Sequence, residues 1–186
     1  MYKRQPQYSD NDGAMNQSAG NGASVILSNS TNETSDITIG VDVSKFQGTI
    51  DWAQAASSGV DFAMIRVGYR AQKTGVIYAD TNAKYNMQQA AANGIKVGVY
   101  FFSSAVNEAE AIEEADWVAD FIADYSITYP VAFDCEGFNT SESRQKSMTK
   151  AERTDVAVAF LQEIYDKGYT PCLLYTSPSP RDAHES

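Results

Sequence analysis

Tyr129-Pro-Val-Ala-Phe-Asp-Cys-Glu-Gly137 is an apolar run that ends in two carboxylates separated by one residue. Such a run predicts a buried strand. Because side chains alternate between the two faces of a strand, Asp134 and Glu136 are expected to point the same way and Cys135 the other way, with about 6.6 Å between the acidic Cα atoms. Burial and mutual repulsion should then separate the two pKa values, so that one carboxyl group stays protonated beside an ionised neighbour.

Strand-like and helix-like patterns alternate around this run from residue 37 onward. Short apolar and β-branched segments predict strands at 37–43, 62–69, 96–103, 129–137 and 169–175. Apolar residues at helical spacing, followed by glycine stops, predict helices within 52–56, 80–93, 107–122 and 149–168. Alternation of this kind is typical of right-handed βαβ units around a parallel sheet.

Two α/β architectures fit this order, a (β/α) barrel and an open doubly wound sheet. The first strand runs into Val41-Asp-Val-Ser-Lys-Phe-Gln-Gly48 and not into a glycine-rich phosphate loop, which weighs against a nucleotide-binding open sheet. We therefore expect a TIM-like barrel, incomplete, with about five strands and four helices. The carboxyl ends of barrel strands form the active face, and six candidate residues fall at or near such ends: Asp42, Tyr69, Tyr100, Phe102, Asp134 and Glu136.

Several charged and polar residues carry more local predictions. Asn107 and Thr149 each precede a glutamate by three residues, which predicts helix N-caps, and Asp80 is placed to cap the helix within 80–93. Arg66 lies in the middle of a strand and is expected to pair with a buried carboxylate. A solvated, acidic outer face is expected for the helix within 107–122, from Glu108, Glu110, Glu113, Glu114 and Asp116.

Composition excludes several classes of partner. At 186 residues with 43% hydrophobic residues the chain can bury a core, and its net charge of −10 argues against binding to nucleic acid or to anionic membranes. No apolar run approaches the ~20 residues needed to insert across a membrane. The N-terminus lacks the apolar centre of a signal peptide, so any secretion signal is expected to lie outside this sequence.

The scarcity of histidine and cysteine narrows the chemistry further. His184 is the single histidine, which weighs against a catalytic triad, a histidine-bound zinc ion or a Cys-His nucleophile. Cys135 and Cys172 could pair, but two separate apolar thiols are the favoured interpretation. Carboxylates are the chemically active groups that the chain has in quantity, and no cofactor is expected.

The carboxylates suggest acid-base work on a glycosidic bond. One carboxyl group would protonate the leaving oxygen while another carboxylate supports the cationic transition state. An Asp at a strand end, such as Asp42, is by itself more often a turn or cap residue, and three carboxylates at strand ends of one sheet favour the catalytic interpretation. Tyr100 and Phe102 share a strand face and suit sugar stacking, although aromatic strand residues are as often simply core.

These segments, in this order, resemble the motifs of glycoside hydrolase family 25 lysozymes over residues 37–171: Gly40-Val-Asp-Val-Ser-Lys-Phe-Gln-Gly48 with Ile50-Asp-Trp52, Phe62-Ala-Met-Ile-Arg-Val-Gly-Tyr69, Gly98-Val-Tyr-Phe-Phe-Ser103 and Pro130-Val-Ala-Phe-Asp-Cys-Glu136. The resemblance implies a flattened β/α barrel that hydrolyses the β-1,4 bond between N-acetylmuramic acid and N-acetylglucosamine in peptidoglycan. It also implies site roles. Glu136 matches the proton donor, Asp134 its catalytic neighbour and Asp42 the active-site aspartate of the first strand. Tyr69, Tyr100 and Phe102 match positions that line the sugar groove.

Composition and the resemblance together predict a division of the chain and a location. Residues 1–36 are predicted to be a disordered linker rich in Asn, Ser and Gly, 37–171 a partial hydrolase barrel, and 172–186 a tail of non-native appearance. The family pattern continues beyond this point with further strands, so we expect a C-terminal truncation that impairs activity. The protein is expected to be a monomer that acts on peptidoglycan glycan strands outside the cell or in the cell wall, and a phage endolysin fits equally.

Two other interpretations stay open from the sequence. A non-catalytic peptidoglycan-binding module would use the aromatic residues and leave the acids incidental. A divalent-cation site would use the oxygen ligands of Asp42, Asp134 and Glu136. The sequence favours hydrolysis over both, without a resident metal ion.

Overall fold

The computed structural model of the chain describes residues 24–27, 38–138 and 140–174. Along the chain these residues form β1 (Ser24–Leu27), β2 (Ile39–Val43), the 3-10 helix η1 (Lys45–Gln47), α1 (Trp52–Ser57), β3 (Phe62–Arg70), β4 (Ile77–Ala79), α2 (Ala83–Ala92), β5 (Lys96–Phe102), α3 (Glu108–Ile122), β6 (Val131–Asp134), α4 (Lys150–Asp166) and β7 (Pro171–Leu174).

Five parallel strands alternate with four helices, as the sequence predicted. Strands β2, β3, β5, β6 and β7 are parallel neighbours in that order, and the helices lie in the connections between them. Two short strands add antiparallel pairs, β1 on β2 and β4 on β3. Strands β1 and β7 stand at the two ends of this order and do not pair with each other, so the sheet formed by the described residues is open and not closed into a barrel.

Strand β1 lies inside the range 1–36, for which the sequence predicted only a linker. Ser24–Leu27 pairs residue by residue with Ile39–Asp42 of β2. The other residues of that predicted linker lie outside the described residues. At the opposite end, residues 172–174 of the predicted tail belong to β7 and pair with β6, whereas 175–186 lie outside the described residues.

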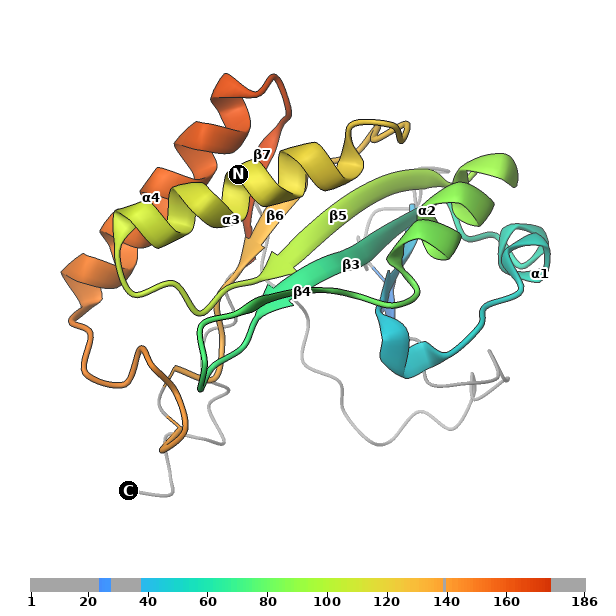
Figure 1. The fold of residues 1–186 in the computed structure, drawn as a ribbon. Helices are drawn as coiled ribbons and strands as arrows, with labels where there is room; N and C mark the ends of the chain where they lie inside the picture. Colours follow the sequence, from blue (N-terminus) through green and yellow to red (C-terminus); the bar gives the residue numbers. More distant parts are fainter. Residues whose placement is uncertain (1–23, 28–37, 139, 175–186) are drawn as a thin grey trace, which may run out of the picture.

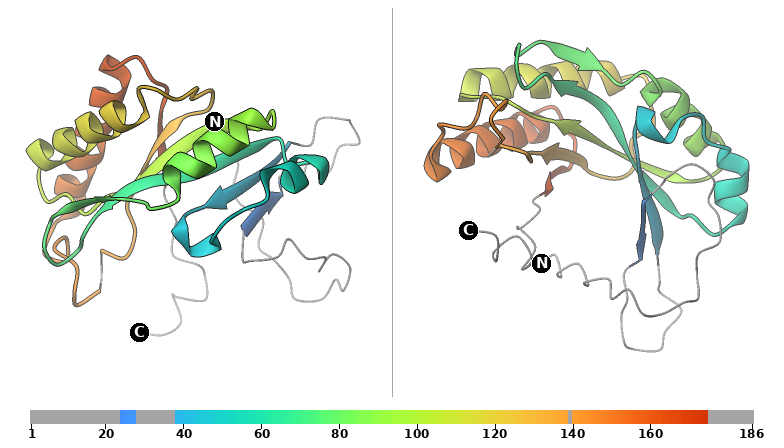
Figure 2. Two further views of the ribbon diagram at one scale, coloured as in Figure 1. Left: turned by 45° about the vertical axis from the view of Figure 1, so that its right-hand side comes forward. Right: turned by 90° about the horizontal axis from the view of Figure 1, so that it is seen from below.

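The helices and the sheet form two layers with the main core between them. Figures 1 and 2 show α2, α3 and α4 on one side of the sheet. The strand side chains facing these helices are apolar and buried: Val41, Val43, Ala63, Ile65, Val67, Val97, Val99, Phe101, Val131 and Phe133. Ring contacts join the layers, with Phe101 on Trp117 of α3 at 5.7 Å and Phe133 on Phe160 of α4 at 5.1 Å between ring centroids.

The predicted caps of the two long helices are confirmed. The Asn107 side chain accepts a hydrogen bond from the Glu110 backbone N–H at 2.9 Å at the start of α3. Thr149 and Glu152 form a reciprocal capping box at the start of α4, with N···O distances of 3.2 and 2.7 Å. These bonds satisfy backbone donors that a helix start otherwise leaves without partners.

The predicted cap of α2 is wrong. Asn82 is the N-cap residue of this helix, and the Asp80 carboxylate is turned to other donors. Its Oδ2 accepts from the Arg66 guanidinium, and its Oδ1 accepts from the Asn82 backbone N–H at 3.0 Å. A buried ion pair needs both partners, so Oδ2 stays with Arg66. Oδ1 bonds the turn that precedes the helix and leaves the N-cap position to Asn82.

Among the described residues, no helix is both long and apolar enough to cross a membrane.

The contact between Phe160 and Phe133 should be a main source of stability, because both rings are 0–1% exposed. We expect Phe160→Ala to lower the free energy of unfolding by about 3–5 kcal/mol, through lost burial and the cavity it leaves. Chemical denaturation followed by circular dichroism measures this loss. Val158 lies on the same helix with 57% exposure, so Val158→Ala is the matched control and should change stability little. Equal losses in the two variants would contradict this assignment of the core.

Candidate active site

Strand register brings the predicted site residues to the side of the sheet that faces away from α2, α3 and α4. In the parallel pairs, Asp42 is opposite Met64, Arg66 opposite Tyr100, and Phe102 opposite Asp134. Because alternate residues share a face and paired residues in adjacent strands share it too, one face carries Asp42, Arg66, Tyr100, Phe102 and Asp134.

Tyr69 reaches the same face through a β-bulge. The register between β3 and β5 shifts between Arg66 and Gly68, so that Tyr69 pairs with Phe102. Without the extra residue, strict alternation from Arg66 would turn Tyr69 toward the helices. The bulge leaves Gly68 on the helix side, where an added Cβ would stand 2.7 Å from the Trp117 ring. Glycine is therefore required there, and the tyrosine beside it is redirected to the site.

Glu136 differs from the prediction made for it. Strand β6 ends at Asp134, so Cys135 and Glu136 lie beyond the strand, and the alternation argument does not apply to them. Glu136 is exposed, whereas Asp134 is partly buried. Gly137 follows with a φ of 67°, a conformation that glycine adopts at little cost. The chain thus turns sharply directly after Glu136.

Asp42 and Tyr100 interact on this face, and each changes the pKa of the other. Burial raises the pKa of Asp42 and the charge of Glu136 adds to it, while the Tyr100 hydroxyl and the charge of Arg66 act in the opposite direction. The pKa of Tyr100 is also raised, by burial first and then by Asp42. Tyr100 therefore stays protonated beside Asp42.

Asp134 has a strongly raised pKa. Its pKa is raised to about 7 by burial first and then by the negative charges of Glu136 and Asp42, and the Arg66 charge opposes this. The prediction of a carboxyl group that holds its proton near neutral pH is thus met at Asp134. The effect of Glu136 and Asp42 on this pKa also indicates that the three carboxylates lie within electrostatic reach of one another.

Arg66 is the cation of the site, and Asp80 is its partner. The guanidinium donates through Nε and Nη2 to the Asp80 Oδ2 at 3.0 and 2.8 Å, and the Asp80 side chain is fully buried. The sequence predicted a buried carboxylate for Arg66 but did not identify it. Charge neutralised in this way still lowers the pKa of Asp42 and Asp134, so Arg66 limits how far burial can raise them.

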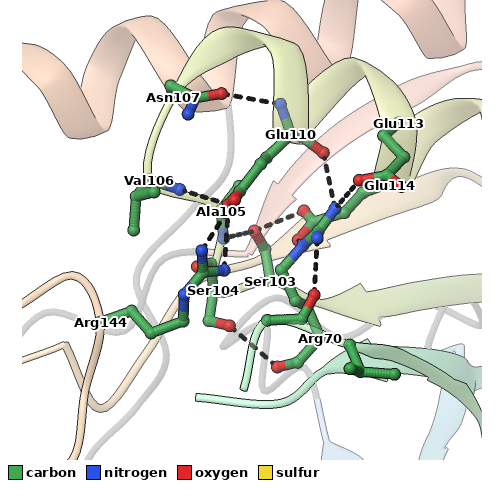
Figure 3. A network of polar contacts seen from close by, with 12 residues as sticks. Arg70, Ser103, Ser104, Ala105, Val106, Asn107, Glu110, Glu113, Glu114 and Arg144 are labelled. Carbon is green, nitrogen blue, oxygen red and sulfur yellow. Dashed lines mark hydrogen bonds and ion pairs between the residues drawn. The ribbon is translucent and has the colours of Figure 1, made fainter. Parts of the chain in front are cut away.

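A second polar network, which the sequence analysis missed, fixes the carboxyl ends of β3 and β5 (Figure 3). Arg70 at the end of β3 donates to Glu114 and Glu113 of α3, at 2.7 Å in each case, and Glu114 also accepts from the Ser103 hydroxyl at 2.6 Å. Glu114 is fully buried, so the predicted solvated face of α3 is wrong at this residue. Burial raises the pKa of Glu114 to about 7, against the opposing effects of Ser103 and Arg70.

The segment after Glu136 joins this network through Arg144. Its guanidinium donates to both carboxylate oxygens of Glu110, at 2.7 and 3.0 Å. Glu110 also accepts from the Val106 backbone N–H at 3.1 Å, and its side chain is only 22% exposed, so it too departs from the predicted solvated face. A bidentate pair of this kind fixes direction as well as distance, which holds the returning segment against α3.

Two contacts extend this support to the acidic residues themselves. The Ser103 backbone N–H donates to the Asp134 carbonyl at 2.8 Å. Gln145, fully buried, accepts weakly from the Cys135 thiol at 3.6 Å and donates to the Ala105 carbonyl at 2.9 Å. Cys135 and Cys172 do not form a disulfide with each other, as the favoured interpretation had it. Cys135, which lies between the two acids, is thus in contact with the segment that follows Glu136.

The metal-site interpretation finds no support in the geometry. Within the described ranges, no three His, Cys, Asp or Glu side chains are grouped closely enough to hold a metal ion. Two surface hollows of about 320 Å³ lie elsewhere, one between α3 and α4 and one beside α1 and α2. The candidate site is instead an open sheet face with carboxylates at its edge.

The Arg70 network predicts a large and specific stability effect. We expect Arg70→Met to lower the free energy of unfolding by about 3–5 kcal/mol, because Glu114 would be left buried without its cation. Adding Glu114→Gln should recover part of the loss, since a neutral amide can still accept from Ser103. Urea denaturation measures both variants. Lys73→Met is the control: Lys73 pairs with Glu142 on the surface and should contribute about 0.5 kcal/mol or less. A double variant no more stable than Arg70→Met would contradict the assigned charge imbalance.

The raised pKa of Asp134 predicts a pH-dependent stability difference. The folded-state pKa is about 7 and the unfolded value is about 4, so the folded state holds more protons between these limits. Stability should therefore fall as the pH rises from about 4 to 7. Asp134→Asn removes this loss and should be more stable than wild type at pH 8 by about 2 kcal/mol, allowing for screening by water. Thermal unfolding at pH 4 and pH 8 tests this, and an equal difference at both values would rule it out.

Comparisons with known proteins agree with this geometry. The family model for Glycosyl hydrolases family 25 matches residues 41–184. Lysozyme M1 of Streptomyces globisporus is 34% identical over 80 residues, which cover 43% of this chain and 25% of that protein. The modular autolysin LytC of Streptococcus pneumoniae has a similar fold, with a TM-score of 0.63 at 21% identity, over 72% of this chain and 31% of LytC. A bacterial lysozyme from Streptomyces coelicolor has a TM-score of 0.53 at 24% identity, over 69% of this chain and 57% of that one. The chain thus spans about a quarter to somewhat over half of these relatives. With a family match over most of its length and the corresponding fold, the chain belongs to glycosyl hydrolases family 25.

Proposed function

We propose that this protein is a muramidase, a lysozyme that hydrolyses the β-1,4 bond between N-acetylmuramic acid and N-acetylglucosamine in peptidoglycan. The observation that carries the proposal is the set of carboxylates at the carboxyl ends of β2 and β6, on one aromatic sheet face in a family 25 chain. Asp42 and Asp134 share that face with Tyr69, Tyr100 and Phe102, and Glu136 follows directly after β6.

Glu136 is the proposed proton donor. It stands beyond the strand and is exposed, so a glycosidic oxygen on the open face can approach its carboxyl group. Donation to that oxygen turns the leaving sugar into a neutral alcohol while positive charge develops at the anomeric carbon. The exposure of Glu136 in the free protein supports this role, because the acid must reach a bond in a long polymer.

Asp134 and Asp42 are the proposed supporting carboxylates. Asp134 is partly buried at the end of β6, and its backbone is held by the Ser103 N–H, which donates to the Asp134 carbonyl at 2.8 Å. Above its pKa of about 7, the ionised Asp134 can from this position stabilise the oxocarbenium-like charge or orient the 2-acetamido group of the substrate for internal attack. Asp42, which interacts with Tyr100, adds negative potential from β2 on the same face.

The aromatic residues are the proposed sugar-binding surface. Tyr69 stacks on Tyr78 of β4, with 5.6 Å between ring centroids, and Phe102 lies between Tyr69 and Asp134 in register. Rings presented in a row along a sheet face can contact the apolar faces of successive pyranoses. The proposed partner is therefore the peptidoglycan glycan strand. The proposed location is the cell wall or the extracellular space, and the protein is proposed to act as a monomer. A phage endolysin also fits this function.

Glu136→Gln tests the proposed acid. The substitution removes the transferable proton but keeps the shape of the side chain, so we expect release of reducing sugars from purified peptidoglycan to fall by at least about 1,000-fold. Binding to insoluble cell walls should stay unchanged. Glu108→Gln, at an exposed position on α3, is the matched control and should keep wild-type activity.

Hydrolysis by the wild type in the presence of a chelator is expected to be normal.

Two results would overturn this function. If Glu136→Gln released sugars at the wild-type rate, another group would be the acid. If the wild-type chain bound cell walls but released no reducing ends, the non-catalytic binding module would be the correct interpretation.

A further inference from the structure

Phe46 is the most exposed large apolar side chain among the described residues, and it stands next to the site. Its exposed fraction is 75%, and it lies in η1, four residues after Asp42. The Arg66 guanidinium lies over the Phe46 ring at 5.0 Å and over the Tyr69 ring at 5.5 Å. Phe46 therefore belongs to the same face as the proposed sugar-binding tyrosine.

The segment that carries Phe46 is firmly held. Ser44 and Gln47 form a capping box around η1, in which the Gln47 side chain accepts from the Ser44 backbone N–H at 2.7 Å. The Lys45 backbone N–H donates to the buried Asp80 carboxylate at 3.0 Å. Because the turn that carries the exposed ring is already ordered, binding of a ligand to the ring costs little backbone entropy, which favours binding.

Lys45 adds an unneutralised positive charge to this surface. Its Nζ lies 5.5 Å from the Phe46 ring centroid and 5.4 Å from the Tyr69 centroid. Arg66 beside it is paired with Asp80, whereas Lys45 forms no ion pair with any described residue. In a chain with a net charge of −10, a lysine without an ion-pair partner among the described residues is a local point of attraction for an anion.

Aromatic rings and a cation together specify the chemistry of a ligand. A pyranose ring can stack on the exposed face of Phe46, and a carboxylate on that sugar can pair with Lys45 through a charge-assisted hydrogen bond. An uncharged N-acetylglucosamine unit would satisfy only the ring. In a glycan strand of peptidoglycan, the muramyl unit is the one that bears a carboxyl-terminated lactyl ether or a peptide attached to it.

We propose that Lys45 and Phe46 form a binding site for a carboxylate-bearing muramyl unit, adjoining the carboxylates at the ends of β2 and β6. This proposal rests on the proposed function, since it names a further contact of the same glycan strand. It adds two residues to the substrate surface and gives the surface a preference for anionic over neutral sugar chains.

Binding measurements in a Glu136→Gln background test the site without turnover. The ligands are chitotetraose, which is neutral, the GlcNAc-MurNAc tetrasaccharide with free lactyl carboxylates, and the same tetrasaccharide carrying stem peptides. Titration calorimetry should give a Kd about tenfold weaker for Lys45→Met with the anionic ligands and within about twofold of the background with chitotetraose. Loss with the free-lactyl ligand assigns Lys45 to the lactyl carboxylate, and loss only with the peptide form assigns it to the peptide.

Phe46→Ala should weaken all three ligands by about tenfold, because ring stacking does not depend on charge. Tyr165→Ala is the matched control, since Tyr165 is 65% exposed on α4, on the helix side of the sheet, and should change no Kd. Phe46→Ala values equal to those of the control, or a Lys45→Met effect of the same size on neutral and anionic ligands, would overturn the site.

The outcome is separable from that of the proposed hydrolysis. Binding is measured in a variant that lacks the proposed acid, so absence of hydrolysis in the wild type would leave these affinities unaffected. Sedimentation velocity closes the remaining alternative. Dimerisation of the background protein that Phe46→Ala abolishes would assign the ring to an interface between two copies and would overturn the sugar-binding proposal.

Discussion

The buried ion pair between Arg70 and Glu114 is the interaction on which the geometry of the site depends. It joins the end of β3 to α3. Because the Ser103 hydroxyl also donates to Glu114, the end of β5 is joined to the same carboxylate. Ser103 in turn donates its backbone N–H to the Asp134 carbonyl of β6. Three neighbouring strands therefore end at positions fixed by one charge pair. Burying these charges has a large desolvation cost, which only the full set of hydrogen bonds offsets. The result is a rigid sheet edge next to the carboxylates of the candidate site.

One face of the sheet packs against the helices and the other carries the candidate site. The strand sequences alternate between residues suited to each face. Val41, Val43 and their counterparts in the other strands bury an apolar layer beneath the helices, while the intervening positions carry the acids, Arg66 and the aromatic rings. The bulge at Val67 breaks this alternation once. It allows two consecutive residues, Val67 and Gly68, to face the helices and returns Tyr69 to the other face. The one extra residue in β3 thus places the Tyr69 ring on the face of the candidate site and leaves the apolar core on the helix side intact.

Local signals predicted this fold well, and long-range pairings limited the prediction. Five strands, four helices and the caps at Asn107 and Thr149 follow from periodicity and from residues three positions apart, which interact whatever the rest of the chain does. The burial of Glu114 could not be found this way. A glutamate on an acidic helix resembles its solvated neighbours, and only a cation 44 residues away in sequence makes it a core residue. Asp80 was misassigned for the same reason, because its partner Arg66 lies on another element. The bulge and β1 likewise depend on strand pairing and not on composition.

Burial along the end of β6 explains how two neighbouring acids can take different roles. The sequence predicted both acids on one strand face with separated pKa values, but β6 ends at Asp134 and Glu136 lies beyond it. Asp134 keeps the sheet behind it and its pKa rises to about 7, whereas Glu136 stands in water. For the proposed reaction this difference in position separates the two roles. Folding fixes Asp134 at the end of the sheet, with its backbone carbonyl bonded to the Ser103 N–H. Glu136 lies beyond the strand and is exposed, so it is the carboxyl group that a glycosidic oxygen on this face can approach.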